Sequence, residues 1–267
     1  MMINRLRRIG AAAILAALAS GGTAAPRDGD WSIPARFRGV TVVGRIKGFP
    51  HRVVALTFDD GPDRRNTPIV LDALKRYRAR ATFFLIGEQV SANRALVERM
   101  VADGHVIGNH SWSHPYRLSQ AEGESQLRRT DDAVRAIIGR PPACIRSPGG
   151  FTNNGIAKAI RARNQPNFLW MVSSADTRKI GSAEIARNVV RGARPGDIIL
   201  MHDGPGHRAT ANAVLTILQG LSEKGYRFVT APELCRLWDS WLTAQGVSQG
   251  IKPAAARAPA SKKSGGA

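Results

Sequence analysis

The sequence has few cysteines, no internal repeat and no long apolar run. Its two cysteines, Cys144 and Cys235, are too few for a disulfide framework, and their spacing is not that of a zinc knuckle or a redox CxxC motif. No segment recurs at the periods of solenoid proteins. The 267 residues are 43% hydrophobic and 22% charged, which excludes a wholly disordered or collagen-like chain. One disulfide and two free thiols both remain compatible with this pattern.

Acidic residues are scarce as well. The chain has 20 Asp and Glu against 39 Lys and Arg, which gives a formal net charge of +19. Such an excess can attract nucleic acid, anionic lipid or an acidic envelope polymer, but it identifies none of them. A solvated basic surface is the simpler interpretation, and weak association with a polyanion or the cell envelope is the alternative. We predict no specific nucleic-acid site.

The first 25 residues have the layout of a secretory signal. Three arginines precede an apolar run, Ile9–Ala19, and small residues follow it as far as Ala25. The run is shorter than the about 20 apolar residues that span a bilayer. We therefore expect a signal peptide over residues 1–25 and an exported protein, periplasmic or secreted, with no transmembrane span after signal removal. Retention through an uncleaved N-terminal anchor is the alternative.

Composition divides the rest of the chain into three parts. Residues 26–50 resemble an extended lead-in, and residues 51–244 have the pattern of a single folded domain. Residues 245–267 are mostly Ala, Pro, Ser, Gly and Lys, a composition that cannot offset the entropy lost on ordering. We expect this last part to be a flexible basic tail.

Short apolar runs alternate with longer amphipathic segments over residues 52–238, as in parallel strands joined by crossover helices. Thr67 and Ser91 indicate helix starts, and Ser119 with Glu122 forms a capping box. Periodicity alone leaves open whether the sheet closes into a barrel or stays doubly wound. In both folds the active site is expected at the carboxyl ends of the strands. The strand candidates are residues 53–58, 81–86, 105–107, 143–146, 167–172, 197–201 and 227–230.

Two adjacent acids follow the first strand candidate, in the sequence TFDDGP at residues 57–62. Neighbouring residues on a regular strand point to opposite faces, so Asp59 and Asp60 can serve one site only if the chain turns there. Gly61 and Pro62 supply such a turn. A helix cap or a turn-stabilising pair is the structural alternative.

Two histidines follow the third strand candidate, in the sequence HSWSH. His110 and His114 are four residues apart, so on a helical turn their imidazoles would lie on one side and could share a cation. This spacing recurs at zinc sites, where an acid can supply a third ligand. Two unrelated surface histidines are the alternative.

Further polar residues lie at or just past later strand candidates. Arg146 begins the sequence RSPGG, Asp176 follows the next strand candidate, and His202 ends the sequence ILMH. Each alone would be explained by an ion pair or a capped turn. Together with the acid and histidine clusters, they indicate one site.

The order of these motifs resembles the polysaccharide deacetylases, also called the NodB-homology or chitooligosaccharide-deacetylase-like family of carbohydrate esterases. The resemblance covers roughly residues 51–238 and is carried by TFDDGP, HSWSH, ILMH and GYRFVT. It implies an α/β fold with a distorted seven-unit (β/α) barrel as the single catalytic domain. The implied activity is metal-dependent removal of N-acetyl groups from a glycan containing N-acetylglucosamine, such as peptidoglycan or chitooligosaccharide. O-Acetyl esterase activity on xylan-type polysaccharide and non-catalytic glycan binding are the alternatives.

The matching motifs assign roles to the first two clusters. Asp60, His110 and His114 would bind a divalent metal, with zinc expected, and Asp59 would be the general base. An amine leaves poorly as an anion, so a proton must reach the nitrogen before the amide bond breaks. By the same resemblance His202 would supply that proton.

Two more residues would position these groups. Asp176 would orient His202 and favour its charged form, while Arg146 would hold Asp59 and keep it ionised. Different partners would thus separate an acid from a base in one pocket.

The chain departs from the family pattern at two motifs. Gly149 stands where an aromatic is usual, although its backbone N–H remains a candidate oxyanion contact; Phe151 could replace the missing wall. Leu200 is a further candidate substrate contact. Ser173 and Thr177 replace the outer residues of the Asp-x-x-Asp-Trp motif around Asp176. These changes affect the expected sugar contacts more than the metal chemistry.

The remaining histidines are assigned less directly. His51, at the entrance to the domain, and His105, within an apolar strand candidate, are interpreted as structural. His207 lies in a loop beside the predicted site, so it is a candidate substrate contact.

Overall fold

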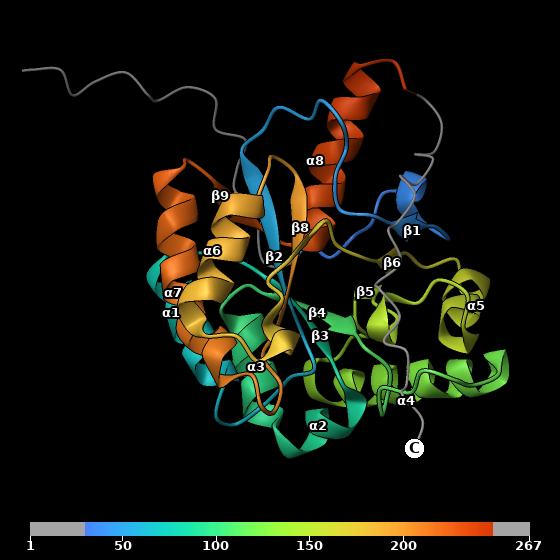
Figure 1. The fold of residues 1–267 in the computed structure, drawn as a ribbon. Coiled ribbons are helices and arrows are strands. Elements are labelled where there is room, and N and C mark those ends of the chain that lie inside the picture. Colours follow the sequence, from blue (N-terminus) through green and yellow to red (C-terminus); the bar gives the residue numbers. More distant parts are fainter. Residues whose placement is uncertain (1–29, 248–267) are drawn as a thin grey trace, which may run out of the picture.

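The computed structural model describes residues 30–247 (Figure 1). The predicted signal peptide and the tail beyond residue 247 lie outside them. Within the described range all strands pair in parallel in one sheet, in the order β1-β6-β5-β4-β3-β2-β8-β7, with β9 beside β2. The predicted α/β fold, a curled parallel sheet in one domain, is confirmed. No helix in this part of the chain combines the length and apolarity needed to cross a membrane.

Helices cover the outside of the sheet, with α1, α6 and α7 on one side and α4 and α5 on another (Figure 1). The strands are β1 (Thr41–Val42), β2 (Val53–Asp59), β3 (Thr82–Leu85), β4 (Val106–Asn109), β5 (Cys144–Ile145), β6 (Asn167–Phe168), β7 (Val172–Ser173), β8 (Asp197–His202) and β9 (Arg227–Val229). The α-helices are α1 (Thr67–Arg76), α2 (Gly87–Ala92), α3 (Arg94–Ala102), α4 (Gln120–Ile138), α5 (Gly155–Ala162), α6 (Ser182–Gly192), α7 (Arg208–Glu223) and α8 (Ala231–Ala244). Short 3-10 helices span Ala35–Phe37 (η1), Pro148–Gly150 (η2) and Asp176–Arg178 (η3).

Strand β2 is the centre of the sheet, and every one of its seven residues is buried. One edge pairs with β8 along residues 54–59. The other edge is shared, because β9 pairs with residues 53–55 and β3 pairs with residues 57–59. Burial on both faces explains the continuous apolar run of this strand. Its carboxyl end therefore brings Asp59 to the middle of one end of the sheet.

The single strand predicted over residues 167–172 was wrong, because this segment forms two strands. Strand β6 pairs with β5 and β1, whereas β7 pairs with β8. Between them the Leu169 N–H donates to the Val42 carbonyl and the Met171 N–H donates to the Ile198 carbonyl. Strands β6 and β7 are near opposite ends of the strand order, although only three residues separate them in the chain. The two ends of the sheet must therefore lie close together, so the sheet is curled. An apolar run does not reveal this change of partner, since Phe168 of β6 and Val172 of β7 are both buried apolar residues.

Two of the three predicted helix starts are confirmed. Helix α1 begins at Thr67, and Ser119 and Glu122 form both hydrogen bonds of the capping box before α4. The start predicted at Ser91 was wrong, because Ser91 lies inside α2. The chain breaks instead at Asn93, whose side-chain amide donates to the Gln89 carbonyl at 2.7 Å and so competes with the continuing helix.

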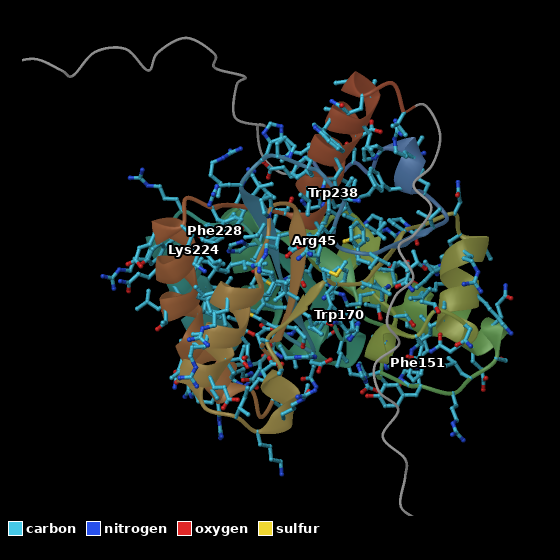
Figure 2. The ribbon with its side chains drawn as sticks, turned by 45° about the horizontal axis from the view of Figure 1, so that its top comes forward. Arg45, Phe151, Trp170, Lys224, Phe228 and Trp238 are labelled. Atoms are coloured by element: carbon cyan, nitrogen blue, oxygen red, sulfur yellow. The ribbon has the colours of Figure 1, made fainter. Side chains whose placement is uncertain are left out.

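The segment before β2 packs into an apolar cluster with α8. Phe37 is 2% exposed and its ring centroid lies 5.9 Å from that of Trp238, which is 1% exposed. Phe49 and Val42 belong to the same cluster. Figure 2 shows Trp238 well away from Phe151, so this cluster lies apart from the segment after Arg146. Residues ahead of the predicted domain start therefore contribute to its core.

Both cysteines are free and buried. Burial raises the pKa of the Cys144 thiol to about 12 and raises that of Cys235 well above its ordinary value. Since the thiolate is the nucleophilic form, these thiols are structural rather than reactive.

Replacement of Phe37 by alanine tests the contribution of the lead-in to the core. We expect Phe37→Ala to lower the free energy of unfolding by about 3–5 kcal/mol, because a buried aromatic leaves a cavity. Urea denaturation measures this change. The control Leu215→Ala, at a side chain that is 38% exposed, should change stability by less than about 0.5 kcal/mol. Equal effects of the two substitutions would show that the lead-in does not stabilise the domain.

Candidate active site

The predicted site residues meet at the carboxyl end of the sheet. Asp59, the last residue of β2, lies directly beside His202, the last residue of β8, in the strand register. His110 follows β4 and Arg146 follows β5, and these two strands are neighbours. The parallel sheet therefore gathers side chains from four strand ends at one place.

Asp60, His110 and His114 form a cluster that fits a metal ion. Their ligand atoms all lie within 4.8 Å of one another. Asp60 Oδ1 lies 3.5 Å from His110 Nε2 and 3.6 Å from His114 Nε2, and this buried oxygen has no hydrogen-bond partner among the described residues. Ligands on a tetrahedral zinc, at about 2.0–2.1 Å from the ion, lie about 3.3–3.4 Å apart. The distances from Asp60 Oδ1 to the two imidazole nitrogens are thus close to those between ligands of a tetrahedral zinc.

The two histidines are held in the form that binds metals. His110 Nδ1 lies 2.8 Å from the Arg146 carbonyl, so this nitrogen carries the proton and Nε2 keeps its lone pair toward Asp60. Burial and the neighbouring His110 lower the pKa of His114, which favours the neutral imidazole. Metal ligation needs a neutral imidazole with a free ring nitrogen. The hydrogen bond at His110 Nδ1 and the lowered pKa of His114 therefore both suit a cation site.

The explanation predicted for the histidine pair, a shared helical turn, was wrong. Residues 110–114 form an irregular loop in which Ser111 and His114 have positive φ angles of 68° and 58°. The Ser111 hydroxyl accepts a hydrogen bond from the His114 N–H at 3.1 Å, and the Asn109 side-chain oxygen accepts one from the Ser111 N–H at 2.8 Å. The imidazole centroids are 4.8 Å apart. The loop brings the rings together through these hydrogen bonds, not through helical periodicity.

Asp59 is paired with a buried arginine. Arg146 is 0% exposed, and its Nη1 donates to Asp59 Oδ1 at 2.6 Å and to Thr57 Oγ1 at 2.9 Å. Its Nε donates to the Phe168 carbonyl at 3.0 Å, and its guanidinium lies 4.1 Å from the centroid of Phe84. These contacts hold Asp59 Oδ1 against a buried cation and fix the orientation of the Asp59 carboxyl group. The second oxygen, Oδ2, lies 3.7 Å from His110 Nε2 and so faces the cation site.

A turn directs both adjacent acids to the same site, as the sequence predicts. Asp60 has a φ of 71°, and the peptide bond between Gly61 and Pro62 is cis. A Cβ at Gly61 would lie 2.5 Å from Oδ1 of Asp203, so only glycine allows the buried Asp203 carboxyl to pack here. Burial, helped by the nearby Asp60 charge, raises the pKa of Asp203 to about 7. Sequence analysis assigned no role to Asp203, although it directly follows His202.

His202 and Asp176 form a hydrogen-bonded pair. His202 Nδ1 lies 2.9 Å from Asp176 Oδ1, while Asp176 Oδ2 accepts from the His202 N–H at 2.8 Å and from the Thr210 hydroxyl at 2.9 Å. Burial alone would lower the pKa of His202, but the Asp176 hydrogen bond and charge, with Asp59 and Asp60 nearby, raise it to about 9. The imidazole is therefore protonated at neutral pH. Sequence analysis missed Thr210, for which a single sequence gives no signal.

His207 lies against this pair. Its ring stacks on that of His202, with centroids 4.9 Å apart, and burial and the His202 charge lower its pKa. Asp176, His202 and His207 also have ligand atoms within 4.8 Å of one another. However, His202 Nδ1 is already engaged by Asp176, so this group is better suited to holding a proton than a metal.

An aromatic pair occupies the place beside Gly149. A Cβ there would lie 3.0 Å from the Phe151 ring and 3.1 Å from the Tyr116 ring, and Gly149 has a φ of 64°. Tyr116 and Phe151 are 53% and 41% exposed, and Tyr116 also contacts the His114 ring edge to face. Sequence analysis named Phe151 but missed Tyr116, whose signal is its position two residues after His114.

The other predicted substrate contacts differ in exposure. Leu200 is 6% exposed and lies two residues before His202, so the two side chains share a face of β8. Ser173 and Thr177 are exposed beside Asp176, and the Ser173 hydroxyl accepts from the Ala175 N–H at 3.1 Å. Small polar side chains thus stand where the family pattern has an acid and a tryptophan.

Comparisons with known proteins agree with this geometry. A family model described as polysaccharide deacetylase matches residues 47–165. Peptidoglycan-N-acetylglucosamine deacetylase PgdA of Listeria monocytogenes is 40% identical over 190 residues, which are 70% of this chain and 40% of that protein. The chain thus spans well under half of PgdA.

Two further relatives are matched over most of their length. A peptidoglycan-N-acetylglucosamine deacetylase of Bacillus cereus is 38% identical over 190 residues, covering 69% of this chain and 89% of that protein. The solved structure of peptidoglycan deacetylase PdaC from Bacillus subtilis has a TM-score of 0.68 and 35% identity, covering 73% of this chain and 95% of that one.

Removing one ligand tests the cation site. We expect Asp60→Ala to weaken zinc binding by more than about a hundredfold, because loss of a ligand should exceed the 10–100-fold cost of losing an outer partner. Competition with a chromophoric chelator measures the affinity. The control His51→Ala removes an exposed imidazole and should leave it unchanged. Unaltered zinc affinity in Asp60→Ala would exclude this cluster as the metal site.

Replacing Asp176 tests the charge of His202. In the metal-free protein, His202 should stay protonated as the pH rises until it titrates near pH 9. Asp176→Asn removes the stabilising charge and should lower the pKa of His202 by about 1–3 pH units. Proton NMR titration follows it, with the buried His105, whose pKa burial lowers to about 4, as internal reference. If the midpoint for His202 is the same in both proteins, Asp176 does not set its charge.

Proposed function

Because this chain belongs to the polysaccharide deacetylase family, we propose that it is a metal-dependent hydrolase that removes N-acetyl groups from N-acetylglucosamine units of a glycan. The single observation that carries the proposal is a cluster fit for a cation, with an Arg-paired carboxylate beside it and, next to that carboxylate, a histidine hydrogen-bonded to an aspartate. A binding protein needs no such acid and base. Peptidoglycan is the favoured polymer, since it is named for the relatives from three bacteria.

Asp60, His110 and His114 would hold the metal, and zinc fits their donor set of one carboxylate and two imidazoles. A divalent cation bound there supplies Lewis-acid polarisation of the acetyl carbonyl and lowers the pKa of water. The three side chains leave the opposite side of the cluster to solvent and substrate. His114 and Asp60 are partly exposed, so this side is accessible.

Asp59 would act as the general base. Its Oδ1 is engaged by Arg146, which leaves Oδ2, directed to the cluster, to take a proton from the attacking water. Arg146 keeps this carboxylate in one orientation and ionised. Water attack on the carbonyl carbon then forms a tetrahedral species whose oxygen requires charge stabilisation. The backbone N–H of Gly149 is the proposed donor for that oxygen.

His202 would complete the reaction as the general acid. With Nδ1 fixed by Asp176, its Nε2–H is the proton that can be delivered to the sugar nitrogen. Cleavage of the carbon–nitrogen bond releases acetate and a free amine on the sugar. Asp176 therefore orients His202 and maintains its charge. The Leu200 side chain, Phe151 and Tyr116 would shape the space around the acetyl group and sugar ring.

Export to the periplasm or cell exterior is part of the proposal, since a peptidoglycan substrate lies outside the cytoplasm. It is supported by the basic, apolar and small-residue order of residues 1–25. Retention by an uncleaved anchor would place the same domain at the membrane surface.

Acetate release separates the possible reactions. We expect the zinc-loaded protein to release acetate from N-acetylglucosamine oligomers and peptidoglycan fragments at least about tenfold faster than from acetylated xylan, and to stop when a chelator removes the metal. Enzyme-coupled acetate detection measures both rates. Preference for xylan would identify an O-acetyl esterase. Absence of metal-dependent acetate from every substrate would reject the hydrolase.

A single substitution then tests the base. We expect Asp59→Asn to lower kcat by about 10²–10⁴-fold, the range of general base catalysis, while the affinity for the oligomer changes little. Rates and a direct binding isotherm are compared with those of the wild type. Normal turnover by Asp59→Asn would remove Asp59 from the mechanism.

A further inference from the structure

Exposed cations lie close in sequence to the candidate active-site residues. They lie in the loops at residues 60–66, 110–119 and 174–181 and at the start of α7, each within six residues of a predicted site residue. We call them the cationic rim: Arg64, Arg65, Arg117, Arg178, Lys179 and Arg208, all exposed. In these loops and in residues 203–208, Asp63 is the one acid that is neither in the site nor buried.

Among residues 30–247, no acidic side chain neutralises the rim cations. Arg64 donates to Asn93 and to the Ala92 carbonyl, and Arg208 donates to the Arg65 carbonyl. No side chain of the rim forms an ion pair with any described residue between 30 and 247. The Asp63 carboxylate instead accepts from the backbone N–H groups of Arg65 and Asn66.

Elsewhere on the same surface arginines do have acidic partners. Arg80 pairs with Glu233 and Arg99 with Asp72, both at 2.7 Å or less, and other pairs join α4 to α5 and η1 to α8. Other exposed cations, such as Arg76, Arg191 and Arg227, form no ion pair with a described residue either. The site loops differ in their charge balance, because outside the site itself their exposed cations have only Asp63 as a partly exposed acid among them.

Taking the proposed deacetylase function as its basis, we propose that the cationic rim selects a glycan that carries carboxylates, as peptidoglycan does, over a neutral one such as chitin. Arginine and lysine bind carboxylates through charge-assisted hydrogen bonds. The exposed ring of Tyr116 contacts the His114 ring, and the exposed ring of Phe151 contacts that of Tyr116, so both can offer apolar faces to a sugar beside the cation site. Aromatic faces with flanking cations suit an acidic sugar chain, whereas base stacking and phosphate contacts would be needed for nucleic acid.

Because the rim side chains are exposed, we expect them to select the glycan by electrostatic attraction. Exposed charges act over about one Debye length, ~10 Å at 0.1 M salt, so the rim would raise the affinity for acidic chains without entering the chemistry. A single exposed ion pair contributes little, so we expect the rim charges together to change the affinity by about tenfold. The preference should disappear at high salt.

The decisive experiment compares one oligomer in two charge states. A fluorescent peptidoglycan oligomer with free carboxylates and the same oligomer after amidation are titrated against the Asp59→Asn protein, in which we expect acetyl removal to be slowed by about 10²–10⁴-fold. We expect amidation to raise Kd about tenfold at low salt and less than about twofold in 0.5 M salt. The triple variant Arg65→Gln, Arg117→Gln, Arg178→Gln, on the same background, should lose most of this preference. Those three side chains make no hydrogen bond or ion pair in the described chain, so folding should be unaffected.

A matched control removes equal charge elsewhere. Arg76→Gln, Arg191→Gln, Arg227→Gln removes three exposed cations at the ends of α1 and α6 and the start of β9, away from the strand carboxyl ends, and should keep the preference. Equal Kd values for the two oligomers, or equal losses in both triple variants, would overturn the proposal. So would rim-dependent binding of duplex DNA that is tighter than binding of the acidic oligomer. The binding isotherms do not depend on turnover, so failure of acetate release by the wild type would reject the deacetylase separately.

Discussion

The buried charge of Arg146 is the constraint on which the candidate site depends. This guanidinium is fully removed from water, and the Asp59 carboxylate compensates it at 2.6 Å. Breaking a buried pair by removal of one partner costs about 3–5 kcal/mol, so folding itself fixes the orientation of Asp59. The Arg146 carbonyl also fixes the proton of His110. One residue therefore positions both the proposed base and a proposed ligand of the cation site.

Asp59, the proposed general base, and His202, the proposed general acid, can share one pocket because their hydrogen-bond partners differ. Asp59 faces a permanent cation, whereas His202 faces the Asp176 carboxylate, and the pKa of His202 rises to about 9 despite its burial. The fold produces this arrangement. Asp59 and His202 are neighbours at the ends of β2 and β8. Their partners come from other segments, because Arg146 directly follows β5 and Asp176 begins η3. Outside these buried pairs lie the exposed rings and cations that we propose to contact the glycan.

The fold class and most of the site could be predicted from the sequence. Alternating apolar and amphipathic runs predicted the parallel sheet, and TFDDGP and HSWSH predicted that Asp60, His110 and His114 meet. The change of partner within residues 167–172 could not be predicted, because a strand that moves from β5 to β8 stays equally apolar. The break at Asn93 was also missed, since it depends on a side-chain hydrogen bond that competes with the helix.

The sequence by itself determined which chemical groups are present and that they follow strands, because short-range pattern fixes strand ends and residue type fixes acid, base and ligand character. Only the tertiary structure decided how these groups work together. The contact of Tyr116 with Phe151, the packing of Asp203 against Gly61 and the hydrogen bond from Thr210 to Asp176 join residues whose proximity depends on the folded path of the chain. Proton affinity and ligand spacing depend on distances in space, and sequence separation does not specify those distances.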